Sequence, residues 1–165
     1  MLSINFIQHK DADTSLLEAI AALKAVRWAY PMEQQMNWIA ENIEPEDWHL
    51  LLKDGEDLVA YMNLVQVKPE IDGTPVAALG IGNVCTKESG KGYGNQLMEA
   101  VNRFLDEKAL YGILFCKDHL VPYYQKFNWI LIRKENCNQE ISQVNTLLYN
   151  IGSGQSTLSY TGRMF

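Results

Sequence analysis

The chain lacks the features that mark membrane, nucleic-acid-binding and secreted disulfide-rich proteins. It contains no apolar run of about 18 residues, the shortest stretch that spans a bilayer as a helix. Its opening stretch, MLSINFIQHKDADTS, also lacks the apolar core of a signal peptide. Fourteen Lys and Arg stand against 20 Asp and Glu, a net charge of −6, whereas nucleic-acid-binding surfaces are basic. We therefore expect a cytoplasmic protein with neither a membrane nor a nucleic acid as partner.

Cysteine and histidine are also scarce. The three cysteines, Cys85, Cys116 and Cys137, are odd in number and have no C-x-x-C spacing, which fits a reduced chain. The three histidines are scattered and give no metal-ligand pattern, so we expect no metal. With 165 residues, 47% of them hydrophobic, the chain is long enough to bury a core, and we expect one domain over residues 1–165.

The order of apolar patterns predicts a mixed α+β domain around one sheet. A short strand in LSINFIQ precedes two helices, the first with Ser15 and Glu18 as a capping box and the second opened by Pro31. Two apolar runs joined at Asp54-Gly55 then predict a hairpin, and VAALGIGNVCT predicts a longer strand. A strand–helix–strand–helix–strand series and a last strand in NTLLYN complete the chain.

The stretch TKESGKGYGNQLMEAV places Gly90, Gly92 and Gly94 directly ahead of a segment with helical periodicity. A glycine inside a helix costs roughly 0.5–1 kcal/mol relative to alanine, so local stability does not explain them. A glycine-rich turn between a strand and a helix N-terminus is a recurrent anion site, and Lys87 and Lys91 flank this one. The alternative is a tight turn with close helix–sheet packing and no ligand.

Two other phosphate motifs do not fit these letters. A P-loop requires a glycine where Cys85 stands and a Ser or Thr where Gly92 follows Lys91. A dinucleotide fingerprint requires Gly-x-Gly-x-x-Gly, whereas these glycines are spaced Gly-x-Gly-x-Gly.

The stretch VCTKESGKGYGNQLMEAV resembles the acetyl-CoA-binding motif of the GNAT superfamily of N-acetyltransferases, a strand followed by Gln/Arg-x-x-Gly-x-Gly/Ala and a helix. Gly92 and Gly94 match its two small positions, and Ser89 stands where Gln or Arg is usual. The resemblance implies that backbone amides hold the CoA pyrophosphate and that Val84 and Cys85 pair with the pantetheine arm. The residues implied around the pyrophosphate are Ser89, Gly90, Lys91, Gly92, Tyr93, Gly94 and Asn95.

A second segment, LFCKDHLVPYYQKFNWI, resembles the later GNAT motif in which a short helix and a tyrosine precede Gly-Phe. Tyr124 falls on the family's tyrosine, and Asn128-Trp129 stands for Gly-Phe. Because this position after a helix often needs positive φ, which Asn tolerates best after Gly, we expect positive φ at Asn128. The two motifs together cover about residues 76–129.

The resemblance implies a GNAT-like fold. We expect a central, mostly antiparallel sheet of about six or seven strands, a splayed parallel pair and about four helices. The implied activity is transfer of the acetyl group of acetyl-CoA, a cosubstrate, to a primary amine by direct attack in a ternary complex. The acidic composition favours a small cationic acceptor such as a polyamine or aminoglycoside-like amine, and a peptide N-terminus stays open.

The chemistry needs a neutral amine, a stabilised oxyanion and a protonated leaving thiolate. The resemblance implies Tyr124 as general acid, with neighbouring Tyr123 as its rival, and the backbone amide of Cys85 as the oxyanion donor. The base stays open, because the strand AALGIGNVC has no carboxylate and Asn83 can only position a water. The alternatives are Glu33, Glu44, Asp47, His49, a terminal carboxylate on Phe165, or a chain of waters.

Two further hypotheses stay open beside the enzyme. The chain is alternatively a non-catalytic acyl-CoA-binding sensor or partner module, as Ser89 and the missing strand carboxylate suggest, or a fold-only coincidence without CoA affinity. Four aromatic residues are either core or the lining of an acceptor pocket, and the last segment offers apolar groups for a homodimer. These aromatic residues are Trp28, Tyr30, Trp38 and Trp48.

Overall fold

The computed structural model describes all residues, 1–165, as two compact units. The first unit comprises Met1–Val65, Gly82–Val101 and Phe165, and the second comprises Gln66–Ile81 and Asn102–Met164. Three elements, two strands and a helix, run from one unit into the other. The expectation of one domain over residues 1–165 therefore stays a prediction. No helix combines the length and apolarity that crossing a membrane requires.

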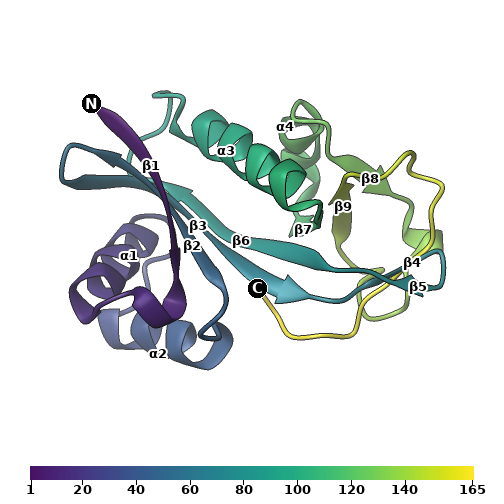
Figure 1. The fold of residues 1–165 in the computed structure, drawn as a ribbon, viewed down its shortest axis with the longest axis horizontal. Helices are drawn as coiled ribbons and strands as arrows, with labels where there is room; N and C mark the ends of the chain where they lie inside the picture. Colours follow the sequence, from purple (N-terminus) through teal and green to yellow (C-terminus); the bar gives the residue numbers. More distant parts are fainter. The chain divides into compact units, whose positions relative to one another are not determined.

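The first unit is built on an antiparallel meander with two helices beside it (Figure 1). The first strand pairs with the second from Leu2 opposite Asp54 to Gln8 opposite Trp48. The second pairs with the third, with an irregularity between Leu52 and Lys53. These elements are β1 (Leu2–Gln8), α1 (Thr14–Arg27), α2 (Met32–Asn42), β2 (Trp48–Asp54) and β3 (Asp57–Val67), with a 3-10 turn at His9–Asp11.

Local sequence explains these boundaries. The expected hairpin at Asp54-Gly55 is confirmed, and Gly55 takes φ of +60°, a value that glycine adopts without strain. The expected capping box at Ser15 is wrong: the N-cap is Asp13, two residues earlier, so α1 begins at Thr14, and Asp13 accepts from the N–H of Leu16 at 2.8 Å. Pro31 precedes α2 as its N-cap, so the second helix opens where expected.

The second unit contains a parallel pair of strands and an antiparallel extension. Strand β6 runs parallel to β7 from Ala78 opposite Tyr111 to Ile81 opposite Leu114, and β9 pairs antiparallel with both β7 and β8. The bounds are β6 (Ala78–Thr86), α3 (Tyr93–Lys108), β7 (Tyr111–Cys116), α4 (Val121–Gln125), β8 (Ile130–Ile132) and β9 (Asn145–Tyr149), with 3-10 turns at Asp118–Leu120 and Lys134–Asn136.

A second, small sheet of three short strands belongs to the same unit and was not expected from the sequence. Its order is β10–β4–β5, and Asp72 and Gly73, both with positive φ, make the turn between the last two. The bounds are β4 (Glu70–Ile71), β5 (Thr74–Pro75) and β10 (Leu158–Ser159).

The main sheet has seven strands in the order β1-β2-β3-β6-β7-β9-β8. The pairs β1/β2, β2/β3, β7/β9 and β8/β9 are antiparallel, and β6/β7 is parallel. With four α-helices, this is the expected mixed α+β class with a mostly antiparallel sheet and one parallel pair, which is confirmed.

Candidate functional site

The glycine-rich turn joins β6 to α3 within the first unit. Gly90 and Gly92 have φ of +77° and +76°, and a Cβ on either would meet no atom within 4 Å. The two glycines are therefore required by backbone conformation and not by close packing. Because α3 begins at Tyr93, only Gly94 lies inside the helix, and the helix penalty that the sequence suggested applies to one glycine instead of three.

The same turn presents free backbone donors at the start of α3. The first backbone bond at this end runs from the N–H of Gln96 to the carbonyl of Gly92 at 3.2 Å. The amides of Tyr93, Gly94 and Asn95 precede it and are the unpaired donors of the first turn. These amides and the positive end of the helix dipole suit an anion such as a pyrophosphate, and the turn from Ser89 to Gly92 is exposed.

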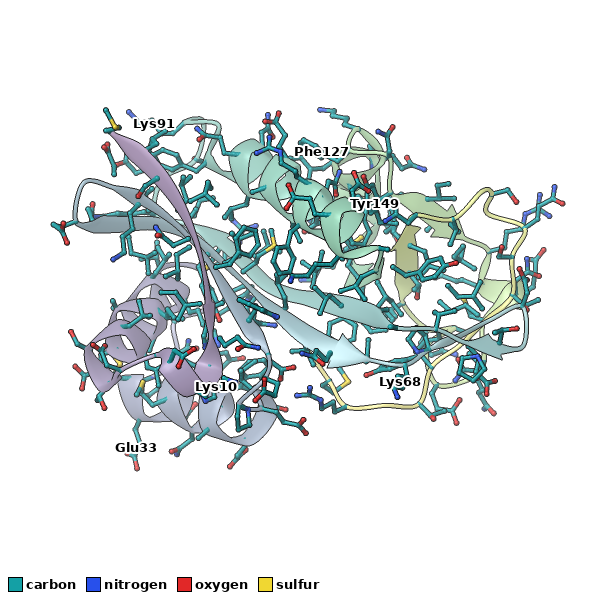
Figure 2. All side chains as sticks on the ribbon, viewed as in Figure 1. Lys10, Glu33, Lys68, Lys91, Phe127 and Tyr149 are labelled. Atoms are coloured by element: carbon teal, nitrogen blue, oxygen red, sulfur yellow. The ribbon has the colours of Figure 1, made fainter.

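The two lysines at the turn are not equivalent. Lys87 donates to a carboxylate oxygen of Asp57 at 2.6 Å, and this bond raises the pKa of Lys87. Lys91 lies 3.9 Å from Glu88, a long and exposed contact, and its side chain stands at the edge of the unit (Figure 2). Lys91 is therefore the better placed to meet a ligand phosphate, because Lys87 already has a close partner.

Strand β6 is distorted directly ahead of the turn. Asn83 has φ of +52° in the middle of the strand, and its side-chain Nδ2 donates to Oδ1 of Asn63 at 2.5 Å. A Cβ on Gly82 would clash with the carbonyl carbon of Phe165 and lie 2.6 Å from its oxygen, so this position requires glycine. The register of β6 with β7 ends at Ile81, just before the distortion, as a splayed parallel pair requires.

Val84 and Cys85 follow this distortion, so their backbone is the part of β6 that the sequence assigns to the pantetheine arm. The thiol of Cys85 is 3% exposed, and burial raises its pKa to about 12. The side chain is consequently an inert thiol at neutral pH. The predicted role of Cys85 requires only its backbone amide and stays a prediction.

Tyr124, the predicted general acid, lies on α4 in the second unit and is 7% exposed. Its ring meets that of Tyr123 edge-on, with centroids 5.2 Å apart, and the pKa of the half-buried Tyr123 is raised by burial. The expected positive φ at Asn128 is confirmed at +66°. The roles of the two tyrosines stay predictions.

The turn after α4 is held by Asn102 of α3, which the sequence analysis did not single out. Its Nδ2 donates to the carbonyl of Phe127 and its Oδ1 accepts from Nε1 of Trp129, both at 2.8 Å. Trp129 is 1% exposed, so the Asn102 side chain satisfies a buried donor while it fixes the end of the helix that carries Tyr124.

A pocket of about 390 Å³ in the first unit gathers three of the four aromatic residues proposed for an acceptor site. Trp48 is not part of it. Residues from α1, α2, their connection and the distorted part of β6 line the pocket: Lys24, Trp28, Tyr30, Gln34, Gln35, Trp38 and Asn83. Gln35 is buried, and its Nε2 donates to the carbonyl of Trp28 at 2.9 Å, which fixes the connection between the helices.

The lysine in this lining, Lys24, is the residue that the sequence analysis missed. It is 2% exposed, and its Nζ lies 4.3 Å from the centroid of the Trp38 ring. Burial lowers its pKa to about 8, with the nearby Cys85 acting in the opposite direction. The signal in the sequence was its position four residues after Ile20, on the apolar face of α1.

None of the candidate bases is an available carboxylate in this pocket. Glu33 and Glu44 are exposed, and Glu33 points from α2 away from the sheet (Figure 2). Asp47 is buried and accepts from the N–H of Glu44 at 2.7 Å, which makes it a cap of its own loop. Of the carboxylates named from the sequence, Glu33 and Glu44 are thus solvated and Asp47 is structural. Phe165 differs, because its carbonyl group lies against Gly82 of β6, although it is not among the residues that line the pocket.

His49 is fully buried in a short chain of hydrogen-bonding rings. Its Nε2 lies 3.0 Å from Nδ1 of His9, and its Nδ1 lies 2.7 Å from the hydroxyl of Tyr61. Burial, with a smaller contribution from His9, lowers the pKa of His49 to about 4, so the ring is neutral at pH 7. No group of three His, Cys, Asp or Glu side chains that could hold a metal is present.

A glycine-rich turn that leaves free amides at a helix N-terminus is an arrangement that suits an anionic group. The family model described as "Acetyltransferase (GNAT) domain" matches residues 8–132. The chain therefore belongs to the GNAT acetyltransferases and is an acyltransferase. A search of curated protein sequences found no significant match.

Solved structures share the fold at low sequence identity. An acyl-CoA N-acyltransferase from Pseudomonas aeruginosa is 19% identical, with a TM-score of 0.66 over 90% of this chain and 99% of that chain. The ribosomal-protein-S18-alanine N-acetyltransferase from Escherichia coli is 14% identical, with a TM-score of 0.63 over 98% and 97%. A GNAT family acetyltransferase from Brucella melitensis, solved in complex with acetyl-CoA, is 13% identical, with a TM-score of 0.59 over 96% of both chains.

Proposed function

We propose that this protein transfers the acetyl group of acetyl-CoA to the primary amine of a small acceptor by direct attack in a ternary complex. The observation that carries the proposal is the junction of β6 and α3. There, the left-handed conformations of Gly90 and Gly92 open onto the free amides of a helix N-terminus. The neighbour from Brucella melitensis, solved with acetyl-CoA, supports the choice of cofactor.

The residues of the turn fit a pyrophosphate. The space in front of Gly90 and Gly92 is open, and Lys91 adds a positive charge that has only a long contact with Glu88. We assign the pyrophosphate to the backbone from Gly90 to Asn95 and the pantetheine arm to the backbone of Val84 and Cys85. Acetyl-CoA supplies an activated acetyl thioester, and the residues of the chain orient it and handle its charges.

In the proposed reaction the acceptor nitrogen forms a bond to the acetyl carbon, and the bond from that carbon to sulfur breaks. The N–H of Cys85 donates to the oxygen on which negative charge develops, and the hydroxyl of Tyr124 gives its proton to the departing thiolate. The amine proton leaves to solvent, because none of the side chains that line the pocket is a carboxylate, and Tyr124 regains its proton from solvent. Asn83, which belongs to the pocket lining, positions the amine through its amide oxygen.

The acceptor pocket supports a small molecule over a protein chain. A volume of about 390 Å³ with two indole rings in its lining matches a compact ligand with a flat or apolar body. The cationic acceptor expected from the net charge of −6 finds less support here, since the only charged side chain in the lining is Lys24. The three free cysteines support a reducing, cytoplasmic setting.

Thermal unfolding with and without acetyl-CoA tests the cofactor assignment, with ATP and NAD as controls. Acetyl-CoA at about 100 times its dissociation constant should add about 2.7 kcal/mol to the free energy of unfolding and raise the midpoint by several degrees. ATP and NAD should give smaller shifts. An unchanged unfolding midpoint with acetyl-CoA would mean that Gly90 and Gly92 form a tight turn that binds no ligand.

The alternative, a non-catalytic acyl-CoA-binding module, makes the same binding prediction and differs in turnover. It predicts a shift with acetyl-CoA but no release of free CoA thiol with any amine. Amine-dependent thiol release rejects it.

A further inference from the structure

We infer that the acceptor carries a carboxylate, as an amino acid does, and that Lys24 is the residue that pairs with it in the pocket. The inference rests on the proposed function and names the substrate class of the same site. The amine end of such an acceptor lies toward Asn83 on β6, and the acid end lies toward Lys24 on α1.

The first support is the state of the Lys24 ammonium. The residue is 2% exposed, yet its Nζ takes part in no hydrogen bond or ion pair. The ammonium lies over the Trp38 ring, and the buried groups near it, Cys85 and His49, carry no negative charge at neutral pH. A buried ammonium without an anion is costly, and a cation–π contact offsets only part of that cost. Because Lys24 lines an open pocket, an anion that enters the pocket supplies the missing partner.

The second support is the absence of negative charge from the lining. No Asp or Glu side chain is among the seven residues that form the pocket. A second cationic group on the acceptor would meet the Lys24 charge with nothing to balance it.

The third support is the orientation of Asn83. Its Nδ2 is engaged by Oδ1 of Asn63 at 2.5 Å, so its Oδ1 is the atom left to accept a hydrogen bond. An acceptor amine donates N–H bonds and suits this oxygen. Asn83 stands two residues before Cys85, so an amine held there is next to the strand assigned to the thioester. The rings of Trp28 and Trp38, which belong to the same lining, then contact the body of the acceptor.

Paired acids and amides test the inference. Glycine, alanine, leucine and phenylalanine are each compared with their carboxamide, which keeps the amine and the shape but loses the negative charge. Two readouts are taken for wild type, Lys24→Met and Lys24→Gln: the kcat/KM of CoA thiol release from acetyl-CoA, and calorimetric binding to the CoA-saturated protein. Lys10→Met, which removes an exposed lysine outside the pocket, is the matched control.

For at least one pair, the wild type should prefer the acid by roughly tenfold or more in binding, the size expected of a hydrogen bond to a charged group. Both Lys24 variants should abolish that preference, whereas Lys10→Met should keep it. For turnover, the ratio of kcat/KM for the acid to kcat/KM for the amide is calculated for wild type and for each Lys24 variant. Dividing the wild-type ratio by the variant ratio removes the effect of the different basicities of the two amines. The result should also be roughly tenfold or more.

Two results would overturn the inference: amides that bind as well as acids in every pair, or an acid preference that survives in both Lys24 variants. A loss of turnover that is equal for acids and amides would instead make Lys24 a proton acceptor and also reject the counter-ion role. The proposed function fails separately, if acetyl-CoA produces no thermal shift or no amine releases thiol. Wild-type binding alone decides the acid preference if the variants do not fold.

Discussion

Replacing Asn102 by alanine should loosen the turn after α4, and the structure sets the size of the effect. The Asn102 side chain makes two hydrogen bonds of 2.8 Å, one to the carbonyl of Phe127 and one from Nε1 of Trp129. The bond to Phe127 contributes about 1 kcal/mol net, and losing the bond from Trp129 costs about 1–3 kcal/mol, because it leaves a buried indole N–H unpaired. We expect a loss of about 2–4 kcal/mol in the free energy of unfolding, which lowers the midpoint by roughly 4–16 °C.

The same substitution should affect catalysis in a specific way. Because α4 carries Tyr124 and ends at the turn that Asn102 fixes, Asn102→Ala should lower kcat. The KM for acetyl-CoA should change little, since the residues assigned to the cofactor lie in the other unit. Steady-state kinetics below the lowered unfolding midpoint separates the two parameters.

A double-mutant cycle with Trp129→Phe isolates the hydrogen bond from the packing of the ring. Trp129→Phe removes the indole donor, so adding Asn102→Ala no longer leaves it unsatisfied. Urea unfolding should therefore show a coupling energy of about 1 kcal/mol or more between the two sites. Additive effects, or an Asn102→Ala protein that melts within a degree or two of wild type, would refute this account of the turn.

Two further predictions concern stability. The pKa of His49 is lowered from 6.5 to about 4 in the folded protein, so between these values the unfolded state binds the proton more tightly. The free energy of unfolding is therefore not reduced by His49 above about pH 6.5, and it falls by roughly 3 kcal/mol as the pH approaches 4. Urea titrations from pH 4 to 7 should show a weaker pH dependence for His49→Gln than for wild type. Gly112→Ala should destabilise the second unit by about 1–3 kcal/mol, because a Cβ there clashes with the indole ring of Trp129 and lies 2.9 Å from Cδ1 of Leu105. A Gly112→Ala protein with an unchanged urea midpoint would show that the Trp129 ring moves aside at no cost.

Much of the fold could be predicted because short-range chemistry determined it. The Asp54-Gly55 turn marks a hairpin through a backbone conformation that glycine adopts without strain, and Asn128 takes the positive φ expected after a helix. The pattern of Gly90 and Gly92 predicted the turn before α3. The predicted cap of α1 was wrong by two residues, since Asp13 and Ser15 are both good caps and only the folded chain selects between them.

The parts that failed depend on contacts between distant segments. Asn83 adopts positive φ within a strand, and its side chain donates to Asn63, 20 residues earlier; no local sequence pattern predicts either feature. In the sequence, Lys24 cannot be distinguished from a solvated lysine. Only the packing of α2 beside α1 brings the Trp38 ring next to its ammonium. The short strands β4, β5 and β10 are too brief to show periodicity, and one of them comes from the chain's last segment.

Release of free CoA thiol from acetyl-CoA, measured with and without a panel of primary amines, tests the central claim most directly. The account predicts amine-dependent release in the wild-type protein. It also predicts that Tyr124→Phe loses turnover while acetyl-CoA still raises its unfolding midpoint, and that the matched Tyr123→Phe variant keeps its activity. Acetyl-CoA binding without thiol release on any amine would contradict the assignment of an acetyltransferase activity, and full activity in Tyr124→Phe would remove that residue from the mechanism.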